Sequence, residues 1–379
     1  MKFTVSSTEL LNHLQTISRV INTKNTLPIL DNFLFEFSGT QLTMTASDLE
    51  TTLVTSMELI SAEGEGKVAV ASKRLLDTLK EFSEQPLNFE INDDNLAMVI
   101  TSANGEFNFI GESGDEYPAL PKLAKDAQSL VVEGGKLASG ITNTVFCTAD
   151  DDLRPMMNGV LFDMSDKLTL VATDAHKLAR LVIDYVSASS SEDNLLSFIL
   201  PKKAANTLKN ILVKETGNVE ILFDDKNIRL NLENYTMICR KIDGKFPNYN
   251  AVIPQNNEYK ITADRLLLLG ALKRVSVFSN QASNLIKLEF ENNRLRVSAQ
   301  DLDFSISGEE TIDCQYAEEA VKIGFKSSFL IEMLSNLSSQ DVIFEFADPS
   351  RAGLILPSEN IEGEDILMLL MPMMLNDEY

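Results

Sequence analysis

The stretch Leu168–His176, "LTLVATDAH", has the pattern of a strand that runs into an aspartate and a histidine. Two other stretches share this form, "LTMTASDLE" at Leu42–Glu50 and "LRVSAQDLD" at Leu295–Asp303. The aspartate recurs at intervals of 126 and 127 residues, as Asp48, Asp174 and Asp301. Catalytic sites are rarely present three times in one chain, whereas a small polar side chain after a strand readily accepts backbone hydrogen bonds in a turn. The repeated aspartate therefore predicts a structural turn in each of three related repeats.

Three further markers recur at the same period. Each repeat opens with a strand and an amphipathic helix, in "FTVSSTEL", "LVVEGGKL" and "YKITADRL", with helix leucines at Leu10, Leu137 and Leu266. A second helix follows a β-rich run and is expected to begin at Lys73, Lys202 and Lys326. Near the end of each repeat an apolar residue precedes a proline, at Tyr117, Phe246 and Met371. This period is too long for a solenoid and suits duplicated domains.

The repeats predict an α+β chain of three similar domains, at residues 1–122, 123–250 and 251–379. Alternating runs such as "LTMTASD" and "NIRLNLEN" indicate half-buried antiparallel strands with turns between them. We expect two helices and about eight antiparallel strands in each domain.

Composition excludes several classes of protein. Cys147, Cys239 and Cys314 are odd in number, far apart and without C-x-x-C spacing, which argues against a disulfide framework and a zinc site and for a reducing cytoplasm. We expect no metal and no cofactor. The apolar run Ile366–Leu375 is far shorter than the roughly 20 residues of a membrane span. It should divide into a strand over about Ile366–Leu370, with alternate residues in the core, and an irregular tail from Pro372.

Charge is divided unevenly along the chain. The net charge of −23 argues against nucleic acid, because phosphate binding depends on Lys and Arg. The predicted helices, however, hold 14 basic and five acidic residues, while the rest holds 19 basic and 51 acidic. These helices are expected at residues 8–24, 73–82, 134–147, 202–214, 264–278 and 326–337. The basic residues that we expect to face a nucleic-acid backbone are Lys24, Lys73, Arg74, Lys136, Lys202, Lys203 and Lys209.

Two other classes of function remain open on these residues. An enzyme would use Asp174 and His176 with a serine or cysteine, but no G-x-S-x-G, H-E-x-x-H, P-loop or G-x-G-x-x-G motif occurs. A scaffold that does not bind DNA would use the methionine-rich ending as an adaptable surface. The scaffold predicts lysines scattered over the outside, whereas a protein that binds nucleic acid predicts lysines that converge.

Five motifs make the chain resemble the bacterial DNA polymerase III β subunit family, the sliding clamps. They are "MKFTV", "TLPIL" at Thr26–Leu30, "VATDAHKLA" at Val171–Ala179, "GKFPNY" at Gly244–Tyr249 and "MPM" at Met371–Met373. The resemblance implies three domains per chain and a head-to-tail homodimer that forms a closed ring. Such a ring encircles duplex DNA without sequence specificity and confers processivity on the replicative polymerase, without being an enzyme. The implied partners are double-stranded DNA, the DNA polymerase III α subunit, the clamp loader and other proteins with clamp-binding motifs.

The resemblance also assigns residues. Lys24, Lys73, Lys202 and Lys203 fall where the family contacts DNA. The family's pocket for partner peptides falls on Met157, Thr173, His176, Lys177, Leu178, Pro247, Val252, Phe329, Leu370, Met371, Pro372 and Met373. The dimer interface falls on Phe107 and Phe109 of one chain and Val277 and Phe278 of the other. Ala175, Lys177 and Ala251 depart from common family residues, which leaves the peptide preference open, and His13 is expected to be a packed or solvated helix residue.

Overall fold

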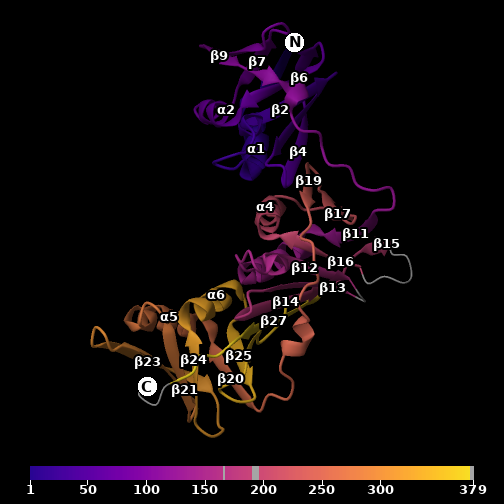
Figure 1. The fold of residues 1–379 in the computed structure, drawn as a ribbon. Coiled ribbons are helices and arrows are strands. Elements are labelled where there is room, and N and C mark those ends of the chain that lie inside the picture. The colour runs from indigo at the N-terminus through magenta and orange to yellow at the C-terminus, as the bar shows by residue number, and fades with distance from the viewer. Residues whose placement is uncertain (165–166, 190–195, 376–379) are drawn as a thin grey trace. The chain divides into compact units, whose positions relative to one another are not determined.

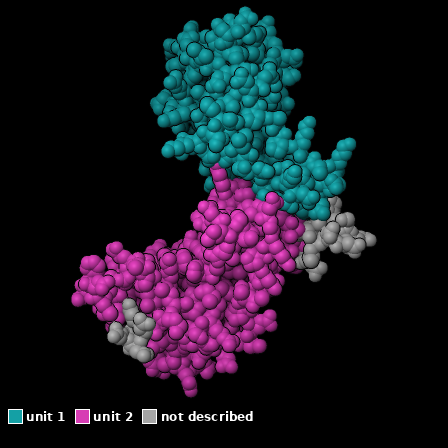
Figure 2. All heavy atoms as spheres, viewed as in Figure 1, with its two compact units in different colours: residues 1–135, 186–190, 207–241 teal, residues 136–185, 191–206, 242–379 magenta. Residues whose placement is uncertain are grey.

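The computed structural model describes residues 1–164, 167–189 and 196–375 (Figure 1). The chain divides into two compact units, coloured separately in Figure 2. Unit 1 comprises Met1–Gly135, Val186–Ser190 and Thr207–Lys241, and unit 2 comprises Lys136–Tyr185, Ser191–Asn206 and Ile242–Tyr379. The middle third of the sequence therefore contributes residues to both units.

The described residues form six α-helices, two in each third of the chain. They are α1 (Ser7–Ile17), α2 (Ser72–Leu79), α3 (Gly134–Thr144), α4 (Lys202–Leu212), α5 (Arg265–Val275) and α6 (Ser327–Asn336). The expected starts of the second helices at Lys73, Lys202 and Lys326 are confirmed to within one residue. No helix in the described part of the chain is both long and apolar enough to cross a membrane.

The first helix is shorter than the sequence predicted. Instead of extending to residue 24 it ends at Ile17, and a 3-10 turn follows at Ser18–Val20. Val20 is fully buried, and the β-branched Ile21 and Thr23 that come next have weak helix propensity. Lys24 consequently lies on a loop and not on a helix.

The leucine marker of the third repeat was also placed wrongly. Leu10 and Leu137 are fully buried, whereas Leu266 is 63% exposed. Leu10, Leu137 and Leu268 are each the fourth residue of their helix, and all three are fully buried. The counterpart of Leu10 in α5 is therefore Leu268.

The strands of the described residues form three antiparallel sheets. The first, in unit 1, has the order β5-β1-β7-β8-β9. Its strands are β5 (Ser61–Glu63), β1 (Lys2–Ser6), β7 (Pro86–Ile91), β8 (Ala97–Thr101) and β9 (Glu106–Ile110). The second, also in unit 1, has ten strands in the order β10-β6-β2-β3-β4-β19-β18-β17-β11-β15. These are β10 (Glu112–Ser113), β6 (Gly66–Ala71), β2 (Asn32–Ser38), β3 (Gln41–Ser47), β4 (Thr51–Glu58), β19 (Tyr235–Arg240), β18 (Asn227–Asn231), β17 (Asn218–Phe223), β11 (Gln128–Glu133) and β15 (Ser187–Ser189).

The third sheet lies in unit 2 and has twelve strands. Its order is β16-β12-β13-β14-β27-β26-β25-β20-β23-β22-β21-β24. The strands are β16 (Leu196–Pro201), β12 (Gly159–Met164), β13 (Leu168–Thr173), β14 (Lys177–Ile183), β27 (Glu364–Leu370), β26 (Gly353–Pro357), β25 (Asp341–Phe346), β20 (Tyr259–Asp264), β23 (Ile306–Gln315), β22 (Arg294–Asp301), β21 (Leu285–Glu291) and β24 (Val321–Lys326).

Two seams join strands from different thirds of the sequence. At the first seam β4 pairs with β19, from Thr51 opposite Cys239 to Thr55 opposite Tyr235. At the second seam β14 pairs with β27 along the range Lys177–Ile183. In both seams the first strand follows one of the repeated aspartates, and the second strand closes a three-strand meander, β17-β18-β19 or β25-β26-β27. The seams are thus two copies of one arrangement.

The repeated aspartates shape turns, as predicted. Asp48 Oδ1 accepts the backbone N–H groups of Glu50 and Thr51 at 3.0 and 2.6 Å. Asp174 Oδ1 accepts the two equivalent groups, both at 2.8 Å, and Asp301 Oδ1 accepts the N–H of Asp303 at 3.0 Å. These side chains are therefore occupied by backbone donors in tight turns.

The C-terminal apolar run departs from the expected alternation. Strand β27 ends at Leu370 as predicted, but all of Ile366–Leu370 is buried. Leu367 and Leu369 pack in an apolar cluster with Leu178, and the alternate residues are buried as well, so both faces of this strand are covered. Beyond it Met371 still donates to the His176 carbonyl, Pro372 has no N–H group to continue the ladder, and an isolated bridge joins Met373 to Gly324 in the described part of the tail.

Candidate functional site

The turn between β13 and β14 presents His176 to solvent and turns Lys177 inward. The Thr173 hydroxyl donates to the Lys177 carbonyl at 2.8 Å and accepts the Ala175 N–H at 3.1 Å. Asp174 fixes the same turn from the other side, and Ala175 takes a left-handed conformation with φ of 75°. Since most residues avoid this conformation, the hydrogen bonds hold Ala175 where glycine would be less strained.

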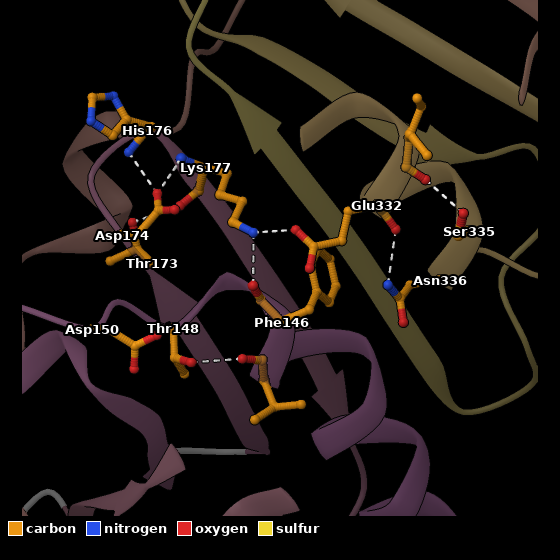
Figure 3. A network of polar contacts seen from close by, with 12 residues as sticks. Phe146, Thr148, Asp150, Thr173, Asp174, His176, Lys177, Glu332, Ser335 and Asn336 are labelled. Atoms are coloured by element: carbon orange, nitrogen blue, oxygen red, sulfur yellow. Dashed lines mark hydrogen bonds and ion pairs between the residues drawn. The ribbon is translucent and has the colours of Figure 1, made fainter. Parts of the chain in front are cut away.

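Lys177 is a buried cation with partners from two other segments of the chain (Figure 3). Its Nζ donates to the Phe146 carbonyl at 2.8 Å and to the Glu332 carboxylate of α6. The same nitrogen lies 5.4 Å from the ring centroid of Phe146 and 4.9 Å from that of Phe329. Lys326 Nζ lies 4.5 Å from the Phe329 centroid. The ammonium group is therefore compensated by a carboxylate, a carbonyl and two aromatic faces, as burial of a charge requires.

Leu178, next in the strand, lies near one end of the second seam. It is 2% exposed and packs with Leu369, directly opposite it on β27, and with Phe246 of the segment that follows β19. Partly buried side chains of the same segment, Ile242, Tyr249 and Ile253, pack against this cluster. The result is an apolar floor crossed by a connecting segment.

The C-terminal tail runs beside the Lys177 turn. The Met371 N–H donates to the His176 carbonyl at 2.9 Å, and the Met373 N–H donates to the Gly324 carbonyl at 2.8 Å. The His176 and Phe329 rings lie 6.4 Å apart. Met371 is 42% exposed and Pro372 and Met373 are half-buried, so thioether groups of the tail remain accessible next to the turn.

Most of the residues proposed for a peptide pocket gather in this region of unit 2. The turn, the second seam and the tail bring together seven of these residues, and the Phe329 ring lies next to His176. The seven are Thr173, His176, Lys177, Leu178, Leu370, Met371 and Met373. Val252 is 55% exposed and lies with half-buried Pro247 on the connecting segment. Met157 is buried in a 3-10 turn and follows Met156, which packs against the Leu178 cluster. Leu370 is fully buried in the ladder and cannot form an accessible wall.

Sequence reasoning missed the groups that hold Lys177. Phe146 and Glu332 come from segments 31 and 155 residues away, so no local pattern connects them to this lysine. One signal was available, because Glu332 is the only acidic residue in the predicted helix 326–337.

The basic residues lie mainly in the first turns of helices. Lys73 and Arg74 are exposed at the start of α2, Lys136 is the third residue of α3, and Lys202 and Lys203 begin α4. These three helices have no acidic residue in the first turn. Because a helix N-terminus carries partial positive charge, cations there oppose stability and favour the binding of an anion. Lys202 Nζ contacts Asp150 at 2.6 Å, Lys209 is half-buried later in α4, and Lys24 is exposed on its loop.

Two strand edges carry exposed apolar side chains. On β9, Phe107 is 36% and Ile110 is 82% exposed, while Phe109 is half-buried. Near β23, Val277 is 74%, Phe278 is 37% and Phe304 is 72% exposed. The sequence had indicated Phe107, Phe109, Val277 and Phe278 but not Ile110 or Phe304.

Comparison with known proteins gives one family along the chain. Residues 1–121, 131–248 and 250–374 match the N-terminal, central and C-terminal domains of the DNA polymerase III beta subunit. The chain is 28% identical over 376 residues to the beta sliding clamp of Pseudomonas aeruginosa, covering 99% of this chain and 100% of the relative. It is also 28% identical over 379 residues to the beta sliding clamp of Haemophilus influenzae, with the same coverage.

A solved structure agrees with the sequence relatives. The sliding clamp of Pseudomonas aeruginosa bound to griselimycin has a TM-score of 0.92 and 27% identity to this chain. The match covers 99% of this chain and 100% of that one. With three domain matches in the order of the family, the chain belongs to the DNA polymerase III β subunit family, the sliding clamps, which are processivity factors and not enzymes.

Proposed function

We propose that two copies of this chain close head to tail into a ring around duplex DNA and tether the replicative polymerase to it. The observation that carries the ring is the arrangement of the seams. Strands β4 and β14 follow repeated aspartates and pair with the closing meander strands β19 and β27. The third repeated aspartate, Asp301, is followed by β23, which has the same place in its repeat as β4 and β14. The third meander, β7-β8-β9, ends with β9, which has the same place as β19 and β27.

Among the described residues these two strands have free edges. Strand β9 pairs only with β8, and β23 pairs only with β22 from Ile306 to Asp313. The exposed Phe107, Ile110 and Phe304 lie at these edges. A third seam between β9 of one copy and β23 of the other would cover both edges, and two such seams close a dimer. The interface would include Phe107, Phe109, Val277 and Phe278.

The basic first turns of the helices support the binding of DNA. Lys73, Arg74, Lys136, Lys202 and Lys203 would supply cations to phosphates, with Lys209 on α4 and Lys24 on its loop. Contacts of this kind position a protein without reading bases, so the ring would slide. The surrounding acidic chain would repel DNA elsewhere.

We propose that partners bind over the Leu178 cluster, between the connecting segment and the C-terminal tail, and this proposed site is called the Leu178 groove. Short peptide motifs of the DNA polymerase III α subunit, the clamp loader and other proteins would insert apolar side chains between Leu178, Pro247, Val252 and the methionines of the tail, beside Met157, Thr173, His176, Phe329 and Pro372. Thioether side chains repack at little cost, which suits several different peptides. We further propose domain boundaries at 122/123 and 250/251, which the family matches support, and a cytoplasmic location.

Topological retention on DNA tests this function. The protein, loaded with a clamp loader or by long incubation, should remain on nicked circular DNA in high salt and be lost when that DNA is linearised. Replacement of Lys24, Lys73, Lys202 and Lys203 by glutamate should weaken DNA association and flatten its salt dependence. The matched control replaces the exposed Lys226, Lys245, Lys260 and Lys322, which makes the same change in charge. Equal loss from circular and linear DNA would refute encirclement, and an unchanged salt slope would remove the four lysines from the DNA path.

A further inference from the structure

A hollow of about 650 Å³ lies at the first seam, entirely within unit 1. Its floor is formed by Val54 of β4, Ile238 of β19 and Leu222 of β17. One wall is the connecting segment that follows β10, through Leu120 and Leu123. The hollow thus has a mainly apolar interior on the ten-stranded sheet.

The hollow opens on the face of the sheet away from α1. Thr55 of β4 faces this helix, because its hydroxyl contacts His13 Nδ1 at 2.7 Å. Neighbouring side chains of a strand point to opposite faces, so Val54 faces away from α1. A ligand in the hollow would therefore leave the helix face free.

The second seam has an equivalent face with different side chains, and this face is filled. Thr52 pairs with Ile238 at the first seam as Leu178 pairs with Leu369 at the second. At the second seam, Phe246 and Tyr249 of the connecting segment pack onto the floor. In the connecting segment of the first seam, Tyr117 packs with Ile29, Leu30 and Leu34 instead, and the part that lines the hollow, "LPKLAKDA" at residues 120–127, has no aromatic residue. The first floor therefore remains open where the second is closed.

The rim of the hollow is positively charged. Lys122, Lys125 and Arg229 line it and are exposed, and within the described part of the chain none of them forms an ion pair. Arg229 Nε donates to the amide oxygen of Asn231 at 2.9 Å. The nearby carboxylate of Asp224 accepts backbone N–H groups of Ala124, Lys226 and Asn227 at 2.7 to 2.8 Å. It therefore anchors the connecting segment. In a chain of net charge −23, three such cations around an apolar floor are complementary to an acidic, apolar ligand.

We propose that this hollow is a second docking site, which binds an extended acidic peptide segment of a partner protein. The apolar side chains of the peptide would cover Val54, Leu222 and Ile238. The carboxylates of the peptide would form ion pairs with Lys122, Lys125 and Arg229. An extended peptide presents alternate side chains to one face, so an acidic and apolar alternation would place its apolar set on the floor. This site is separate from the Leu178 groove and does not depend on ring closure.

Methyl NMR of the full-length protein tests the site with two octapeptides of alternating sequence, aspartate-leucine and lysine-leucine. The acidic peptide should produce saturable shifts at Val54, Leu123 and Ile238, and the basic peptide should not. The double variant K122E/K125E should weaken the acidic peptide about tenfold or more, since both rim charges reverse. The matched control K226E/K245E changes charge equally at exposed lysines that do not line the hollow, and it should bind as the wild type does.

Three outcomes of the peptide experiment would overturn the proposal. They are saturable shifts confined to Leu178 and Val252, equal weakening by the two double variants, and the absence of saturable shifts at the floor. If the methyl signals of the floor shift with protein concentration when no peptide is present, a second copy of the chain occupies the hollow. This result would also overturn the proposal.

Discussion

Lys177 is a single residue whose burial depends on groups from distant parts of the chain. Its side chain is 6% exposed, whereas that of its partner Glu332 is 40% exposed. Removing one member of the pair therefore has a different effect from removing the other. A buried ammonium group without its carboxylate is left uncompensated, whereas a half-exposed carboxylate without its cation can be solvated.

The first prediction concerns the order of these two losses. Glu332→Leu should lower the free energy of unfolding by about 3 kcal/mol, because the ammonium group of Lys177 stays buried without its carboxylate partner. Lys177→Met should cost about 1 kcal/mol or less, since an apolar chain of similar length then faces Phe146 and Phe329. Urea unfolding of both single variants and of the double variant measures which substitution lowers the free energy of unfolding more. The double variant should be more stable than Glu332→Leu alone. Equal costs, or a larger cost for Lys177→Met, would contradict the assignment.

His13 gives a prediction for pH. Burial lowers the pKa of this imidazole below 6.5, although the nearby Glu9 and Glu215 partly oppose the shift. The unfolded chain then binds the proton at higher pH than the folded chain does. The contribution of His13 to stability is therefore fully present above pH 6.5 and is lost as the pH falls from there towards the folded pKa.

Replacement by asparagine should flatten this dependence. Below pH 6.5 the wild type should lose up to about 1.4 kcal/mol more per pH unit than His13→Asn. Urea unfolding of both proteins at a series of pH values measures the difference in slope, which is independent of the constant cost of losing the contact to Thr55. Parallel stability curves would show that His13 titrates alike in both states.

At the scale of elements, the C-terminal tail separates binding from folding. Strand β27 is held by its ladder to β14, whereas residues beyond Leu370 add two described backbone hydrogen bonds, from Met371 and Met373. Deletion of residues 371–379 should therefore leave a folded protein with a Tm only a few degrees lower, while abolishing polymerase binding and stimulation. Calorimetry, light scattering and a polymerase pull-down measure the three properties.

Two controls complete this experiment. The double variant Met371→Ala with Met373→Ala keeps the tail backbone and should lose most of the peptide binding, because its thioethers are gone. Deletion of residues 376–379 keeps both methionines and should bind as the full chain does. Unfolding of the long truncation would instead make the tail part of the core, and normal polymerase binding by it would remove the tail from the groove.

The elements also show which features could be predicted from the sequence. Helix starts, the aspartate turns and the end of β27 depend on local pattern, and each was found within one or two residues. The end of α1 was missed, although the β-branched Ile21 and Thr23 that follow it are a local signal against a longer helix. The seam between β4 and β19 joins residues about 180 positions apart, and its strands alternate like any others, so the pairing has no local signal. The partners of Lys177 were missed for the same reason.

For the whole molecule, the proposed third seam between copies can be tested by introducing one charge. Phe107→Asp places a carboxylate on the exposed edge of β9, where desolvation in an apolar contact would cost several kcal/mol. The variant should remain folded and become monomeric by light scattering at low concentration, with loss of retention on circular DNA. The matched control is Ile60→Asp, which changes another apolar residue of the first domain, 66% exposed and outside both edges. It should remain dimeric. A dimeric Phe107→Asp protein would refute the interface on β9, whereas monomers of both variants would show that any such charge disturbs the first domain.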